Sequence, residues 1–150
     1  MKKFLVALVA IFAVTAASAQ ISNVGIRFNG GAHHTGANLI GQYDLGGSNH
    51  IEGRLGFGGG TTSITGLYNW EIEKFNWTPS LGQWFFDAGV GANVAFASGY
   101  TGISALGTAQ LGIKFNDAPV SVTFDLEPTL FLTGNLNFDV YGGVSVAYHF

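Results

Sequence analysis

Residues 84–96 have the sequence WFFDAGVGANVAF, in which two kinds of side chain alternate. Every second residue from Trp84 to Phe96 is apolar, whereas those between them are mostly small or polar and include Asp87. Successive side chains of an extended strand point to opposite faces of a sheet. This period of two therefore predicts a β-strand with one apolar face and one small or polar face.

The same alternation recurs along the chain. It is clearest in residues 120–132 and in the last segment, residues 140–150. Weaker versions predict further strands at residues 23–31, 36–43, 49–59, 61–70 and 102–115. Gly, Asn, Asp and Pro residues between the segments favour reversal of the chain, so eight strands are expected to pair in an antiparallel, up-and-down order.

Residues 1–19 have the features of an export signal. The basic start Lys2-Lys3 is followed by an apolar run over residues 4–14 and by small residues up to Ala19. The run is shorter than the roughly 20 residues that a transmembrane helix needs. We therefore expect a signal peptide that is cleaved after Ala19, leaving residues 20–150 as one domain.

Composition narrows the class of protein. Only 10% of the residues are charged, whereas 14% are aromatic and 23 of 150 are glycine. A cytosolic domain needs more charged residues than this to cover its water-exposed surface. The net charge is -3 and no Lys/Arg cluster follows the leader, so nucleic-acid binding is not expected. The chain has no cysteine, which excludes disulfides, thiolate metal sites and a cysteine nucleophile.

The residues opposite the apolar stripe indicate which way the strands face. This polar face carries few charges for a solvated surface, but its opposite charges can pair inside a narrow lumen. We therefore predict an all-β fold, an eight-stranded antiparallel up-and-down transmembrane β-barrel with apolar side chains outward and a lumen filled by side chains. The alternative is a soluble lipocalin-like barrel with its apolar face inward. The expected lumen charge network is Arg27, Glu52, Arg54, Asp87, Lys114, Asp125 and Glu127.

Aromatic residues gather near the ends of the predicted strands. Such rings favour a membrane interface, because their apolar bodies contact acyl chains while Trp and Tyr keep a polar atom hydrated. We therefore predict two aromatic girdles. One contains Tyr43, Trp70, Trp77 and Trp84, and the other contains Phe28, Phe57 and Phe96.

The end of the chain carries the most specific resemblance to a known family. Residues 144–150, VSVAYHF, end in an aromatic residue after alternating apolar ones. In this the chain resembles the small eight-stranded outer-membrane proteins that include the OmpA membrane domain and OmpX, and residues 51–63 look like an uncharacterised outer-membrane subfamily. The resemblance implies that Tyr148 and Phe150 form the signal read by the barrel assembly machinery.

The resemblance also implies a location and partners. The mature chain is expected in the cell outer membrane, as a monomer in contact with outer-membrane lipid, after passage through periplasmic chaperones and the assembly machinery. Periplasmic turns are usually short in such barrels, whereas residues 71–83 form a long connection on that side. Either the fourth strand extends further, or the chain is atypical.

Candidate catalytic and metal-binding groups are few. Asp125 and Glu127 share a face about 7 Å apart, but carboxylates in a lumen are more often balanced by Arg or Lys. His33-His34 has no acidic or cysteine partner nearby. His149 faces the lumen alone. No metal and no cofactor are therefore predicted.

We therefore expect no catalytic residue and no enzyme, but an integral outer-membrane barrel with a structural or surface-interaction role. One alternative is a lipid-modifying enzyme, which needs a Ser-His pair brought together across strands. Another is a small passive pore, which needs a continuous lumen.

Overall fold

The computed structural model describes residues 21–32 and 35–150. The predicted signal peptide and His33-His34 lie outside these residues. No helix in the described ranges is long and apolar enough to cross a membrane. The strands are β1 (Ile21–Gly30), β2 (Thr35–Asp44), β3 (Asn49–Gly58), β4 (Thr61–Phe75), β5 (Gly82–Ala97), β6 (Tyr100–Phe115), β7 (Val120–Phe131) and β8 (Asn137–His149).

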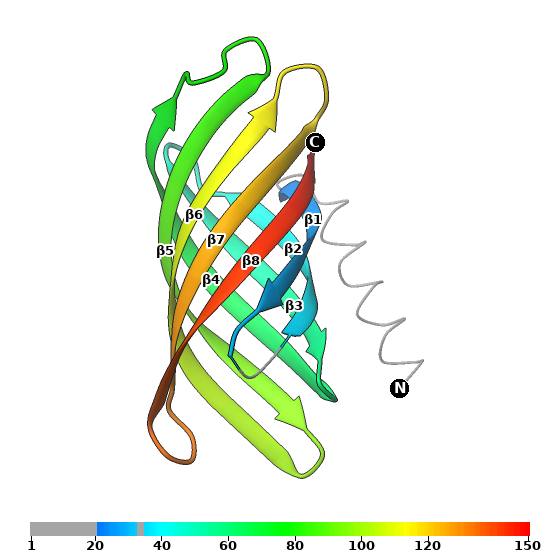
Figure 1. The fold of residues 1–150 in the computed structure, drawn as a ribbon, viewed down its shortest axis with the longest axis vertical. Coiled ribbons are helices and arrows are strands. Elements are labelled where there is room, and N and C mark those ends of the chain that lie inside the picture. The colour runs from blue at the N-terminus through cyan, green and yellow to red at the C-terminus, as the bar shows by residue number, and fades with distance from the viewer. Residues whose placement is uncertain (1–20, 33–34) are drawn as a thin grey trace.

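All eight strands form one closed barrel in chain order (Figure 1). Each strand is antiparallel to the next, and β1 also pairs with β8, from Asn23 opposite His149 to Gly30 opposite Gly142. Closure gives every strand two neighbours and removes exposed sheet edges. The predicted eight-stranded, antiparallel, up-and-down barrel is confirmed.

The two ends of the barrel have short connections. We call the end where β1 begins and β8 ends, at the top of Figure 1, the terminus end, and the opposite end the distal end. At the distal end Gly59 and Gly60 join β3 to β4, with φ angles of 55° and 75°. Positive φ at both positions matches the twist of a two-residue hairpin and favours glycine.

Strand β4 is longer than the alternation predicted. It continues to Phe75 and β5 starts at Gly82, so only residues 76–81 remain of the expected long connection. The pairing with β5 shifts register between Glu71 and Glu73, as at a β-bulge. The extra residue interrupts the alternation of side chains but not the pairing of the strands, so the alternation predicted a fourth strand that ends too early. Of the two alternatives, the extended fourth strand is correct.

The outer face of the wall is apolar and the inner face is polar. Val90, Phe124 and Val146 on the outer face are 55%, 54% and 51% exposed. Arg27 and Glu52 on the inner face are each 2% exposed. A lipocalin-like barrel has the opposite polarity, so the structure argues against that alternative.

Candidate functional site in the barrel lumen

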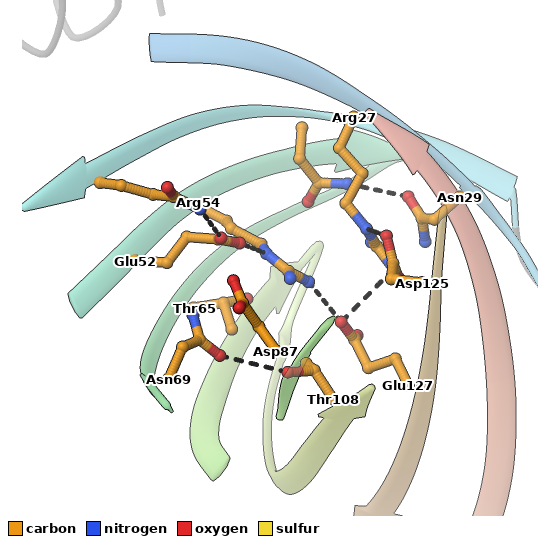
Figure 2. Close-up of polar contacts among 12 residues, drawn as sticks. Arg27, Asn29, Glu52, Arg54, Thr65, Asn69, Asp87, Thr108, Asp125 and Glu127 are labelled. Carbon is orange, nitrogen blue, oxygen red and sulfur yellow. Dashed lines mark hydrogen bonds and ion pairs between the residues drawn. The ribbon is translucent and has the colours of Figure 1, made fainter. Parts of the chain in front are cut away.

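Five charged side chains meet inside the lumen (Figure 2). They come from β1, β3 and β7, and each occupies an inward position of its strand. All five residues are buried, with between 2% and 9% of their surface exposed. We call this group the plug; its members are Arg27, Glu52, Arg54, Asp125 and Glu127.

Arg27 joins β1 to β7 across the lumen. Its Nε donates to Asp125 Oδ2 over 2.9 Å, and its Nη2 donates to Asp125 Oδ1 over 2.5 Å. The same Nη2 lies 3.4 Å from Glu127 Oε2. The fork of a guanidinium matches the two oxygens of a carboxylate, so this bidentate pair fixes direction as well as charge.

Gly143 of β8 makes room for the Arg27–Asp125 pair. Strand β8 lies between β1 and β7, and a Cβ atom on Gly143 would lie 2.6 Å from both Arg27 Nε and Asp125 Oδ2. Real Cβ atoms do not approach polar atoms so closely. The glycine therefore leaves the space through which the pair forms.

Arg54 holds the other half of the plug. Its Nε donates to Glu52 Oε1 and its Nη1 donates to Glu127 Oε2. The second oxygen of Glu52 accepts from Gln42 Nε2 over 2.7 Å. Buried charges are tolerated only when paired in this way, since removing one partner costs about 3–5 kcal/mol. The two arginines therefore hold three carboxylates together.

Two residues of the expected charge network lie outside the plug. Lys114 is exposed near the end of β6, because the strand carries it past the plug toward the terminus end. Asp87 is buried on β5, but it makes no ion pair with either arginine; its Oδ2 lies 3.9 Å from His50 Nε2. The expected network of seven residues is thus a plug of five.

The plug lies between two cavities. The terminus-end cavity has a volume of about 530 Å³ and the distal cavity about 240 Å³. No plug residue lines either of them, whereas four plug residues line a void of only about 30 Å³. The residues that line the distal cavity in the described part of the chain are all uncharged. The charged and titratable side chains that line the terminus-end cavity are Asp44, His50, Glu71, Lys74, Asp87, Lys114 and His149.

Several lumen residues were missed from the sequence. His50 lies in β3, within the strand predicted at residues 49–59, and faces the lumen. His50 is two residues from Glu52 and four from Arg54, and residues an even number apart on a strand share a face. The predicted inward facing of Glu52 and Arg54 could therefore have placed His50 in the lumen as well. Asn69 is 0% exposed and its Oδ1 accepts from Thr108 Oγ1 over 3.2 Å.

A serine and a histidine meet across β7 and β8. His149 Nε2 lies 2.8 Å from Ser121 Oγ. Ser121 is 4% exposed and lines the void of about 30 Å³. The pair faces the lumen, so it is not presented to the outer, apolar face of the wall.

The predicted girdle residues lie mostly on the outer face. The structure gives the following exposed fractions: Tyr43 39%, Trp70 39%, Trp77 59%, Phe28 65%, Phe57 38% and Phe96 45%. Trp84 is only partly exposed, because its ring lies 5.5 Å from that of Trp77 and its Nε1 donates to Thr78 Oγ1 over 2.8 Å.

The two residues of the expected assembly signal are both exposed. Tyr148 and Phe150 are 51% and 77% exposed, and their rings pack edge to face with centroids 5.4 Å apart. Phe150 also lines the terminus-end cavity, so the two rings lie at the rim of the barrel at this end.

Comparison with known proteins gives a fold and no family. No family model matches the chain, and no curated protein matches it. The solved N-terminal β-barrel domain of OprF from Pseudomonas aeruginosa is similar, with a TM-score of 0.56 and 15% identity, covering 87% of this chain and 99% of that one. At this identity the likeness shows a shared fold alone.

Proposed function

We propose that this protein is an integral outer-membrane β-barrel with a non-enzymatic, structural or surface-interaction role. The observation that carries the proposal is the polarity of a closed barrel wall: large apolar side chains such as Phe124 are exposed, whereas Arg27, Arg54 and Glu52 are sealed inside. Side chains that would be unfavourable in water are suited to acyl chains. The similarity to the OprF barrel domain supports the same reading.

Electrophoretic mobility tests this proposal. The protein folded in detergent should migrate differently before and after boiling, because a closed barrel resists denaturation by the gel detergent until it is heated. It should also partition with lipid vesicles and not with the aqueous phase. Quantitative solubility of the folded chain without detergent would contradict the proposal.

The proposal extends to orientation, biogenesis and relatives. The terminus end would face the periplasm, with Tyr148 and Phe150 presented to the assembly machinery after delivery by periplasmic chaperones and removal of residues 1–19. The barrel would then act as a monomer in outer-membrane lipid. Residues 51–63 would place it in the uncharacterised subfamily that they resemble.

A passive pore is the alternative that the plug disfavours. A conducting lumen needs a continuous path, and eight-stranded barrels have interiors that side chains fill. Here Arg27 and Arg54 tie β1 and β3 to β7 between the two cavities. We expect no steady single-channel conductance from the protein in planar bilayers; regular open steps would support the pore.

The Ser121–His149 contact favours a hydrolase as the second candidate. A serine activated by a histidine is the nucleophile of many acyl-transfer enzymes. However, Ser121 is nine-tenths buried and the void beside it is about 30 Å³, too small for an acyl ester. We expect no labelling of the folded protein by a fluorophosphonate and no fatty-acid release from envelope lipids. Labelling that disappears in Ser121→Ala would establish the enzyme.

A further inference from the structure

We propose that the terminus-end cavity binds an organic amine, whose primary ammonium group is held by Asp87 and His50. The proposal goes beyond the proposed function, because it depends on the cavity and not on the location of the barrel in a membrane. The cavity volume of about 530 Å³ lies within the range of small-molecule sites.

Asp87 supplies the first observation. It lines the cavity, is 4% exposed, and its Oδ1 has no hydrogen-bond partner among the residues that the structure describes. Both arginines of the lumen already bind the carboxylates of the plug. A buried carboxylate is costly unless it is paired or hydrogen-bonded, so Asp87 carries a buried acceptor whose hydrogen-bonding capacity is unused.

His50 supplies the second acceptor. It also lines the cavity, is 9% exposed, and its Nε2 has no hydrogen-bond partner in the described part of the chain. The 3.9 Å between this nitrogen and Asp87 Oδ2 is too long for a direct hydrogen bond. One small donor group lying off the line between them can reach both.

The surrounding charge selects a cation. Glu71 and Glu52 act on Asp87 with like charge, and Lys74 is the cation that opposes them. Lys74 is itself 3.0 Å from Glu71. An ammonium head beside Asp87 would relieve this excess of negative charge, whereas an anion would increase it.

The donor geometry favours an amine over a metal ion. No group of three or more His, Cys, Asp or Glu side chains within residues 21–32 and 35–150 is arranged to hold a metal. A primary ammonium carries three N–H donors on one centre, so it can donate to the Asp87 carboxylate and to neutral His50 Nε2 together. The rest of the ligand would extend along polar walls that include Gln42 and Asn49.

Calorimetric titration of the detergent-folded protein tests the site, with spermidine as the probe. Saturable binding of one spermidine per barrel is expected. Hexamethonium, which has two charges and no N–H donor, and Ca²⁺ should each bind at least tenfold more weakly. Equal binding of either comparison ion, or no saturable spermidine binding, would overturn the proposal.

Variants locate the site. Asp87→Asn should weaken spermidine binding at least tenfold, and His50→Gln should weaken it severalfold. Asp117→Asn removes the same charge from an exposed turn residue outside the cavity and should leave binding unchanged. Each variant is first checked for the mobility shift of a folded barrel. Unchanged affinity in either folded site variant, or an equal loss in Asp117→Asn, would contradict the assignment.

Discussion

The inner and outer faces of the barrel wall consist of alternate residues of the same strands, yet the two faces differ in which side chains they can accept. On β7, Phe124 and Leu126 are 54% and 59% exposed, whereas Asp125 and Glu127 beside them are 6% and 9% exposed. The outer side chains need only be apolar, because acyl chains adapt to them. Each inner charge needs a particular partner, so the inner face should tolerate change far less.

The largest effect is expected inside, at Arg54. Arg54→Met leaves Glu52 and Glu127 without their shared cation and should lower the free energy of unfolding by about 3–5 kcal/mol. Urea unfolding in lipid vesicles measures this. Lys74→Met is the matched control, since the Lys74 and Glu71 side chains are 50% and 30% exposed near the terminus end, and solvent-accessible pairs contribute about 0–1 kcal/mol. Similar losses in both variants would contradict the account of the plug.

The next effect is expected outside, at Val90. Val90→Arg places a charge on the outer face near the middle of β5 and should cost about 2–4 kcal/mol in a bilayer. Ile72→Arg, also on an exposed outer residue but close to the terminus end, should cost about 0–1 kcal/mol. The same unfolding measurement in vesicles compares them. Equal costs at the two depths would argue against a membrane around the wall.

Neighbouring glycines of β8 give the smallest and most local comparison. Gly143→Ala adds an atom against the Arg27–Asp125 pair and should destabilise the barrel by about 1–3 kcal/mol. Gly142 faces the other way, with open space at its Cβ position. Gly142→Ala should therefore change stability by less than about 0.5 kcal/mol. Guanidinium midpoints of the two variants decide whether the plug needs the space.

Much of the fold could be predicted from the period-two pattern. A strand whose alternate residues are apolar has its facing settled along its whole length, so the inward placement of Glu52, Arg54, Asp125 and Glu127 followed from parity alone. The exception is β4, where the bulge near Glu71 interrupts the alternation. The end of the strand, residues 71–75, was therefore not predicted.

The partners within the lumen could not be predicted. Parity gives the face of Asp87 and Lys114 but not their height, which depends on how far the strands are staggered around the closed barrel. This stagger brings Arg27 to Asp125 and leaves Asp87 beside His50. The role of Gly143 was equally hidden, because a missing side chain has no sequence signal until its neighbours are known.

Spin labelling along β7 tests the central claim most directly. The chain has no cysteine, so single cysteines at residues 122–126 can each carry one nitroxide in the vesicle-bound protein. Labels at Val122, Phe124 and Leu126 should be accessible to oxygen, which concentrates in acyl chains, and those at Thr123 and Asp125 should not. A reversed alternation, or none, would contradict a barrel with its apolar face toward lipid and its charges within.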